Sequence, residues 1–196
     1  EEGAAREPAE GAPTWVVDPI DGTANFSRGV PHWCVSIALV RGPEMLAGAI
    51  FDPMLNELFS ASQGGGAFVN GTPMRAAATP GLKQASVEVG WNMRTRPEIF
   101  LNLVGRVIGK GSGMQRCGSG ALALAYVAAG RSDAFIEYHI NAWDCLAGNL
   151  MVAEAGGYVN DFLANDGLRK GNCLLACAPA LREELLEIAR AEGFAL

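Results

Sequence analysis

Residues 15–23 read Trp15-Val16-Val17-Asp18-Pro19-Ile20-Asp21-Gly22-Thr23, an apolar run that ends in a turn carrying two carboxylates. The run predicts a buried strand that ends at Asp18, and α/β proteins place their sites at the carboxyl ends of such strands. Pro19 fixes its own φ and favours an extended Asp18, while Asp21 and Gly22 favour a tight turn. We therefore expect Asp18 and Asp21 to face one pocket.

This pair of acids predicts a metal site. Two carboxylates at close range repel one another unless a cation lies between them. Oxygen ligands suit Mg²⁺ or Mn²⁺ better than Zn²⁺, and the Ile20 carbonyl offers a further neutral oxygen. Gly22 and Thr23 follow, and backbone N–H groups at a helix start can receive phosphate oxygens. Because Asp, Pro and Gly are also the commonest turn residues, this segment alone fits an ordinary turn equally well.

A second segment, far along the chain, carries a third carboxylate. Asp144 follows Trp143 and precedes a small and apolar run that ends at Gly156 and Gly157, which predicts a buried helix over residues 143–155. Asp144 then lies in the first turn of that helix, where a carboxylate can also serve simply as an N-cap. Read together, the two segments predict three carboxylates that hold divalent metal against a phosphate.

Both segments resemble motifs of the inositol monophosphatase family, which is related to fructose-1,6-bisphosphatase. The first family motif is similar to residues 18–23, and the second is similar to Trp143-Asp144 followed by residues 154–157. Other similar stretches occur in family order, at residues 29–31, 35–39, 64–68, 70–71, 118–119 and 124–130. Two motifs in order, with matching flanks, carry far more weight than either motif alone.

The resemblance implies an α/β fold of the α+β kind, a layered αβαβα sandwich that is N-terminally truncated because the family's first helix pair is missing. Residues 1–196 would form a single domain, with the metal turn and an antiparallel sheet in 1–79 and an α/β half in 80–196. Periodicity and turn residues locate the elements independently. Strands are expected at 35–40, 45–51, 57–61, 85–89, 113–116, 132–137 and 173–176, a hairpin at 66–75, and helices at 97–108, 118–129, 143–155 and from 180.

The resemblance also assigns roles to particular residues. The implied metal ligands are Glu1, Asp18, the Ile20 carbonyl, Asp21 and Asp144, with Glu2 as the alternative to Glu1. The implied catalytic residues are Glu1, Thr23 and Asp21, of which Glu1 and Thr23 would position the attacking water. The implied substrate-binding residues are Gly22, Thr23, Gly118, Ser119, Gly120, Glu137 and Asp144.

Two of these positions have their own chemistry. Glu137 matches an acid that binds sugar or inositol hydroxyls, and an ionised carboxylate is a pure acceptor suited to that task. It fits a solvated acid at a strand end equally well. Gly120 stands where the family often has Ala, so the substrate pocket of this chain is expected to differ there.

By resemblance, the chain is a Mg²⁺-dependent phosphomonoester hydrolase that acts on inositol 1-phosphate or a similar polyol or sugar phosphate. Two or three Mg²⁺ ions per site are expected, Mn²⁺ is an alternative, and lithium should inhibit. Fructose 1,6-bisphosphate, histidinol phosphate and a nucleoside bisphosphate are alternative substrates. A non-catalytic fragment that acts through protein contacts is a further alternative, because the missing region supplies an acid that bonds the threonine matched by Thr23.

Composition narrows the remaining classes of function. The chain has 196 residues, 49% of them hydrophobic, which predicts one globular unit. A net charge of −6 with scattered basic residues argues against a nucleic-acid partner. The apolar segments are either too short or too rich in Gly and polar residues for a membrane span, so we expect no membrane partner and a cytoplasmic setting. The expected ligand is therefore a small phosphate monoester, and the resemblance implies a homodimer.

Overall fold

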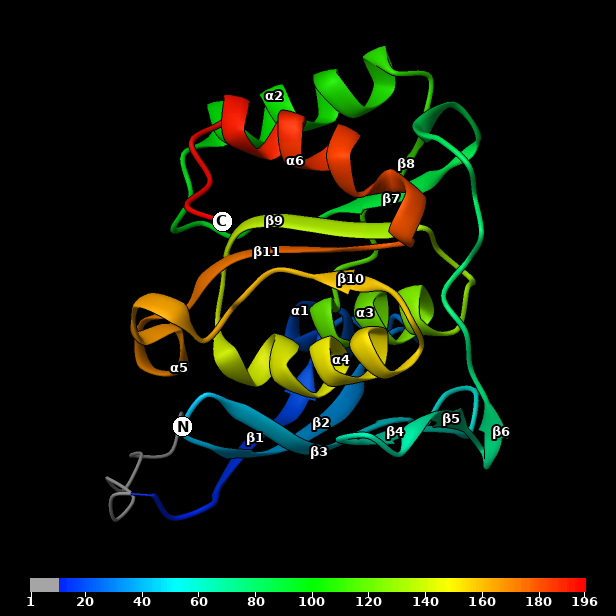
Figure 1. Cartoon of the computed structure of the whole chain (residues 1–196), viewed down its shortest axis with the longest axis vertical. Coiled ribbons are helices and arrows are strands. Elements are labelled where there is room, and N and C mark those ends of the chain that lie inside the picture. Colours follow the sequence, from blue (N-terminus) through cyan, green and yellow to red (C-terminus); the bar gives the residue numbers. More distant parts are fainter. Residues whose placement is uncertain (1–10) are drawn as a thin grey trace.

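The computed structural model describes residues 11–196, so Glu1 and Glu2 lie outside the described residues. The chain is arranged in layers of helix, sheet, helix and sheet (Figure 1). The first sheet is antiparallel and follows the order of the chain. Its strands are β1 (Thr14–Asp21), β2 (Cys34–Arg41), β3 (Glu44–Asp52), β4 (Glu57–Ser62), β5 (Gly66–Val69) and β6 (Thr72–Pro73).

The second sheet is mixed and has a different strand order. From edge to edge it contains β10 (Tyr158–Val159), β11 (Asn172–Cys177), β9 (Ala134–Ile140), β7 (Ser86–Val89) and β8 (Gly113–Gln115). β7 pairs in parallel with both β8 and β9, and the other pairs are antiparallel. The carboxyl ends of β7 and β9 therefore lie at the same edge of the sheet, which is where an α/β sheet can form a binding crevice.

Two helices, α3 (Gly120–Ala128) and α4 (Ala142–Glu154), fill the space between the sheets. Both are apolar on nearly every side because protein surrounds them. Small residues allow the close packing: a Cβ added at Gly48 would lie 2.9 Å from the Ala147 Cα, and one at Gly148 would lie 2.4 Å from the Leu124 Cβ. The run of small residues around Asp144 is thus explained by packing.

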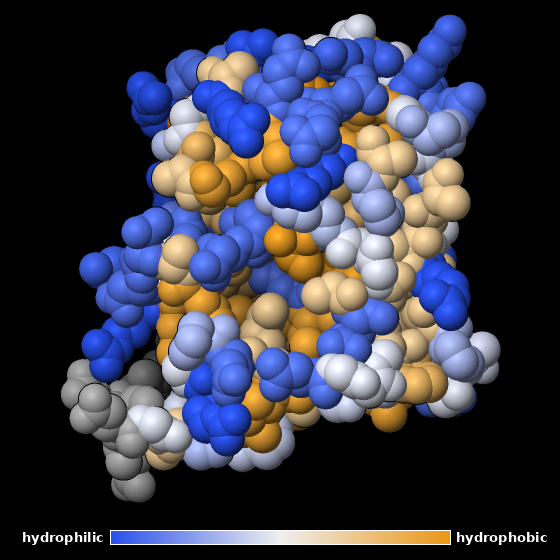
Figure 2. Space-filling model, in the orientation of Figure 1, coloured by the Kyte–Doolittle hydropathy of each residue, from blue (hydrophilic) through white to orange (hydrophobic). Residues whose placement is uncertain are grey.

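The outer helices, α2 (Pro97–Gly109) and α6 (Arg182–Ala191), cover the other face of the second sheet. α2 buries Ile99, Leu103 and Val107, which recur at a helical spacing of four residues. Its outward surface is mixed, with Leu101 and Ile108 exposed among polar residues, and Figure 2 shows mostly polar residues in blue over this layer at the top. These two helices separate solvent from a second hydrophobic core, which lies between them and the second sheet.

Most of the predicted elements are confirmed, with small differences at their ends. The Asn70-Gly71 hairpin is shorter than expected and spans β5 and β6, with both turn residues at positive φ, as a tight hairpin turn requires. A 3₁₀ turn at Pro179–Leu181 precedes the closing helix α6. The short elements α1 (Thr23–Phe26), α5 (Gly167–Lys170) and β10 leave too little periodicity for such a prediction, although a helix start at Thr23 was expected.

One prediction about the first strand is wrong. β1 continues through Asp21 instead of ending at Asp18, with an irregularity in its pairing between these residues. It is the first strand in the order of the sheet and therefore an edge strand. Its outer face is not buried, since Trp15 and Val17 are 65% and 49% exposed. Only the alternate side chains, such as Val16, pack on the core. Apolar residues on both faces indicated burial on both sides, but no described helix covers the outer face.

Among residues 11–196, no helix combines the length and the apolar character that crossing a bilayer would require.

Candidate metal and phosphate site

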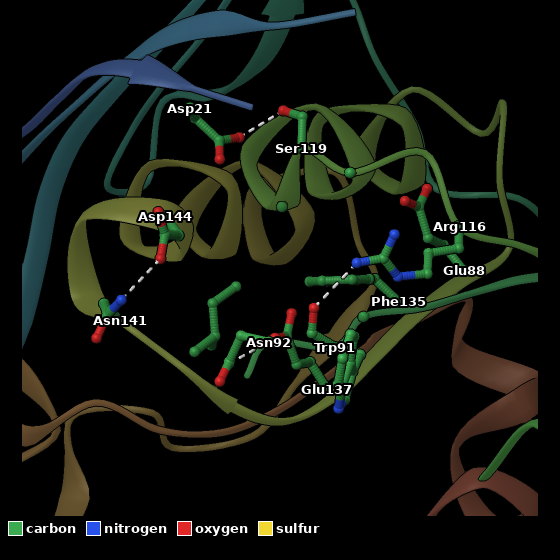
Figure 3. Close-up of a pocket in the computed structure, with 14 residues that line it drawn as sticks. Asp21, Glu88, Trp91, Asn92, Arg116, Ser119, Phe135, Glu137, Asn141 and Asp144 are labelled. Carbon is green, nitrogen blue, oxygen red and sulfur yellow. Dashed lines mark hydrogen bonds between the residues drawn. The ribbon is translucent and has the colours of Figure 1, made fainter. Parts of the chain in front are cut away.

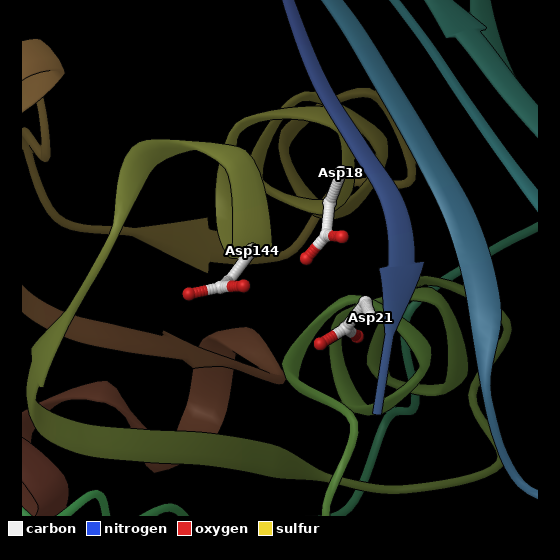
Figure 4. Close-up of side chains that lie close together, drawn as sticks. All are labelled: Asp18, Asp21 and Asp144. Atoms are coloured by element: carbon white, nitrogen blue, oxygen red, sulfur yellow. The ribbon is translucent and has the colours of Figure 1, made fainter. Parts of the chain in front are cut away.

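Three carboxylates converge where β1 meets the start of α4. Asp18 and Asp21 lie at the end of β1, and Asp144 lies in the first turn of α4 (Figure 4). One carboxylate oxygen from each residue lies within 4.8 Å of the others. The sequence prediction that two distant segments bring these acids together is therefore met by the geometry.

The local turn explains how two acids three residues apart reach one site. The Ile20 N–H donates to Asp18 Oδ1 at 2.9 Å, which fixes the start of the turn. Gly22 then adopts a left-handed conformation with φ of 88° and precedes α1. A Cβ at this position would lie 3.0 Å from the His32 carbonyl oxygen. Both the positive φ and this close approach of the His32 carbonyl therefore favour glycine at position 22.

Asp21 is held by the start of α3. Its Oδ2 accepts a hydrogen bond from the Ser119 hydroxyl, one from the Ala121 N–H at 2.8 Å, and a weaker one from the Cys34 thiol at 3.8 Å. No described residue donates to Oδ1, which leaves that oxygen available to a ligand. Burial raises the pKa of Asp21 to about 6, even though these hydrogen bonds favour the ionised form.

Asp144 is oriented from the opposite side. The Asn141 side-chain amide donates to Asp144 Oδ2 at 3.2 Å, and Arg94 donates to Asn141 Oδ1 at 2.8 Å. Burial, followed by the nearby carboxylates of Asp21 and Asp18, raises the pKa of Asp144 to about 8. Three carboxylates that disfavour one another's ionisation are stabilised by a divalent cation, and an all-oxygen donor set fits Mg²⁺. The site thus has the chemistry of a metal centre.

Thr23 and Ile20 complete the outer side of the site. The Thr23 hydroxyl donates to the Ile20 carbonyl at 2.8 Å. Its own oxygen can therefore still accept a hydrogen bond from water, and the carbonyl keeps a second lone pair. Both residues line an open cleft of about 850 Å³ together with Gly22 and the three acids.

A smaller cavity of about 170 Å³ continues inward from Asp21 and Asp144 (Figure 3). Among its lining residues are four of the predicted substrate-binding positions besides Asp144: Gly118, Ser119, Gly120 and Glu137. Glu137 is only 7% exposed, and the Asn92 amide donates to its Oε1 at 3.0 Å. Burial raises the pKa of Glu137 to about 7. It is therefore an enclosed acid of the cavity wall and not a solvated strand end.

The neighbouring positions have distinct roles. The Ser119 hydroxyl caps α3 by accepting from the Leu122 N–H at 3.2 Å and donates to Asp21. The Cys34 thiol is a third partner at 3.7 Å. A Cβ at Gly120 would lie 2.9 Å from Ile140 Cδ1. A side chain at this position would therefore crowd Ile140, which also lines the cavity.

Tyr138, the next residue after Glu137 on β9, does not line this cavity. Its ring packs edge-on against Phe194, with ring centroids 5.3 Å apart, in the outer core beneath α6. Successive residues of a strand point to opposite faces of the sheet, so Glu137 and Tyr138 cannot share one pocket.

Several lining residues were missed by sequence reasoning. Glu88 is the last residue but one of β7, and Arg116 follows β8. Trp91, Asn92 and Arg94 belong to the loop that follows β7. No motif marks them, because their place depends on how β7, β8 and β9 pair. Asn141 could have been found, since it stands three residues before Asp144 at the predicted helix start. Glu1, the remaining predicted ligand, lies outside the described residues.

Comparison with known proteins agrees with this architecture. Residues 1–193 match the model of the inositol monophosphatase family. The chain is 47% identical over 157 residues to a Nus factor SuhB from Xylella fastidiosa, covering 79% of this chain and 57% of that protein. It is 42% identical over 163 residues to an inositol-1-monophosphatase from Rhizobium meliloti, covering 82% and 61% respectively. The chain thus spans less than two thirds of these relatives.

Solved structures share the same fold. The inositol monophosphatase from Anabaena superimposes with a TM-score of 0.88 at 31% identity, covering 97% of this chain and 77% of that one. The expected layered α/β sandwich is therefore confirmed by structure as well as by sequence. From its matched length, its fold and its two carboxylate motifs, the chain belongs to the inositol monophosphatase family.

Proposed function

We propose that this chain is a Mg²⁺-dependent phosphomonoester hydrolase that acts on inositol 1-phosphate or a similar polyol or sugar phosphate. The observation that supports this best is the convergence of Asp18, Asp21 and Asp144 beside the Gly22 turn, at the mouth of a polar cavity. The phosphate would lie at the carboxylates, and the alcohol part would extend into the cavity.

Asp18, Asp21, Asp144 and the Ile20 carbonyl would hold the metal, with Glu1 as a further ligand. Bound Mg²⁺ would lower the pKa of the attacking water and neutralise charge on the leaving oxygen. By resemblance to the family, two or three ions would bind, with Mn²⁺ as a substitute for Mg²⁺. Lithium should inhibit by competing for one of these positions.

The chain's own groups would then bind and orient the reactants. The Gly22 and Thr23 N–H groups lie where α1 begins, and they can donate to the phosphate oxygens. The Thr23 hydroxyl donates its hydrogen to the Ile20 carbonyl, so its oxygen can accept a hydrogen bond from the attacking water and orient it. Ser119 would hold Asp21 in position, and Glu137 would accept from the alcohol part of the substrate.

The relatives leave a second candidate. The Xylella protein is named as a Nus factor and not as a phosphatase, which favours the alternative in which the chain acts through protein contacts. Such a role needs no intact metal site. The retention of three convergent acids with their orienting partners therefore favours catalysis over this candidate.

The test is phosphate release from inositol 1-phosphate, fructose 1,6-bisphosphate and histidinol phosphate, each with Mg²⁺ and with a chelator. We expect release that requires Mg²⁺ and is fastest with one of these substrates. Equal and negligible rates in every arm would contradict the hydrolase and leave the protein-contact role. Homodimer formation, expected from the family, is checked on the same sample by light scattering.

A further inference from the structure

The inner cavity carries charged groups that the metal site does not use. Asp21 and Asp144 line one side, and Figure 3 shows Glu88 and Arg116 on the side remote from Asp144, with Glu137 lining the wall below. Cations bound at the three aspartates would neutralise only the outer side. When the acids at the inner side are ionised, they therefore gain from a further positive charge nearby.

Glu88 and Glu137 are desolvated acids with few partners. Glu88 is 4% exposed and accepts from the Cys117 N–H at 2.8 Å, while Glu137 is 7% exposed and accepts from Asn92. Neither forms an ion pair with any residue in the described part of the chain. Burial raises the pKa of both carboxyls. Their ionised forms would gain from a cation inside the cavity.

Arg116 offsets only part of this charge. It is the one basic residue that lines the inner cavity within residues 11–196. Its guanidinium donates to the Trp91 carbonyl at 3.2 Å and lies 5.9 Å from the Trp91 ring centroid. From that position its charge partly offsets the rise in the pKa of Glu88 and Glu137 that burial causes, without pairing directly with either carboxylate. When both acids are ionised, one cation near them leaves a formal excess of one negative charge.

We propose that Glu88 is a specificity-determining residue that, together with Glu137, binds a protonated amine on the alcohol part of the substrate. This inference rests on the proposed function and ranks amino-alcohol and amino-sugar phosphates above their hydroxyl analogues within its class of polyol and sugar phosphates. An ammonium group supplies three donors and one positive charge, whereas a neutral hydroxyl supplies one donor and no charge. Only the amine both pairs with the carboxylates and balances their charge.

The test compares pairs of substrates that differ only by an amine in place of a hydroxyl. The pairs are glucosamine 6-phosphate with glucose 6-phosphate, and serinol phosphate with glycerol 1-phosphate. Values of kcat/KM are measured at saturating Mg²⁺. A hydrogen bond between charged groups predicts that the amine is preferred by about tenfold or more. A ratio near one, or a preference for the hydroxyl, would overturn the proposal.

Variants assign the preference to Glu88. Glu88→Gln keeps the shape and an acceptor for the Cys117 N–H but removes the charge, so the amine preference should fall toward one. Glu98→Gln changes an exposed acid of α2 and should leave the ratio unaltered. Arg116→Met removes the competing cation from an exposed side chain, so the amine preference should rise. An unaltered ratio in Glu88→Gln, in a variant with wild-type circular dichroism, would contradict the assignment.

Binding separates this inference from the proposed function. Calorimetric titration of each phosphate into the protein with Ca²⁺ in place of Mg²⁺ measures affinity without relying on turnover. Tighter binding of the amines without any phosphate release under Mg²⁺ would contradict the proposed hydrolase activity and support the amine-binding site. Phosphate release with no amine preference in rate or affinity would contradict only the amine-binding site. If neither substrate of a pair binds, both proposals are contradicted.

Discussion

Ser119 donates its hydroxyl hydrogen to Asp21 Oδ2, although the two residues are 98 positions apart in the sequence. The same hydroxyl oxygen accepts from the Leu122 N–H and so caps α3. One side chain thus links the fold of a helix to the orientation of a proposed metal ligand. This relationship gives the most specific structural prediction about the site.

Ser119→Ala should weaken both functions. Loss of the cap predicts a fall of about 1 kcal/mol in the free energy of unfolding, and loss of the donor to Asp21 predicts weaker Mg²⁺ binding. Urea unfolding and calorimetric Mg²⁺ titration measure the two effects. Ser132→Ala is the matched control, because Ser132 is also buried and bonds the Ser86 carbonyl, remote from the acids. Equal Mg²⁺ affinity in both variants would refute the link.

Gly90→Ala should separate substrate binding from metal binding. A Cβ at Gly90 would lie 2.1 Å from Glu137 Oε2 and 2.9 Å from Phe135 Cε2, so Glu137 must move. We expect KM for the phosphomonoester to rise about tenfold, as the loss of one hydrogen bond to a charged group predicts, with Mg²⁺ affinity retained.

Gly81→Ala provides the control for this substitution. Gly81 has an extended backbone, and its added Cβ would meet only Glu184 Oε1, at an ordinary 3.6 Å. KM should therefore match that of the wild type. A KM for Gly90→Ala that also equals the wild-type value would remove Glu137 from substrate binding.

Glu137 should make the metal-free protein less stable as pH rises. Burial raises the pKa of Glu137 in the folded protein to about 7, against 4.5 as its ordinary value. Between these values the folded state holds a proton that the unfolded chain has lost, so the free energy of unfolding falls with increasing pH. Above pH 7 the loss from this group reaches roughly 3 kcal/mol at most.

The measurement is urea unfolding in a chelator from pH 4 to pH 8, for the wild type and for Glu137→Gln. The variant lacks the titrating group, so its stability should decline less steeply between pH 4.5 and 7. Parallel curves for the two proteins would show that Glu137 is not an enclosed acid. The comparison subtracts the contributions of the other buried carboxyls, which are common to both.

Much of the fold follows from local patterns. The turn at Asp18–Asp21 and the small-residue helix containing Asp144 each have signals within a few residues, and both were predicted. The exposure of Trp15 could not be predicted, because it depends on what covers the outer face of the first sheet. An apolar residue in a strand indicates β structure regardless of whether that face is packed.

The site was predictable to the same extent. Asp18, Asp21 and Asp144 are marked by their motifs, but Glu88 and Arg116 are not. Those two residues reach the cavity because β7 pairs in parallel with both β8 and β9, a long-range arrangement that no short motif encodes. The role of Ser119 in holding Asp21 was hidden for the same reason.

Mg²⁺ binding should release protons. The pKa of Asp144 is raised to about 8 and that of Asp21 to about 6, so at pH 7 the metal-free site retains a proton that Mg²⁺ must displace. The apparent affinity should therefore increase by about tenfold per pH unit between pH 6.5 and 7.5. Titration calorimetry in two buffers with different ionisation heats measures the protons released, and equal heats in both buffers would contradict this expectation.

The central claim is that the three-aspartate site performs metal-dependent phosphate ester hydrolysis. Its most direct test is phosphate release from inositol 1-phosphate by the wild type and by Asp144→Asn, with and without Mg²⁺. Asp144→Asn keeps the shape of the side chain while removing one charge from the cluster. We predict release that requires Mg²⁺ and that falls at least about a hundredfold in the variant, as the loss of roughly 3 kcal/mol of transition-state stabilisation implies. Release that persists unchanged in Asp144→Asn, or that proceeds equally without Mg²⁺, would contradict the account.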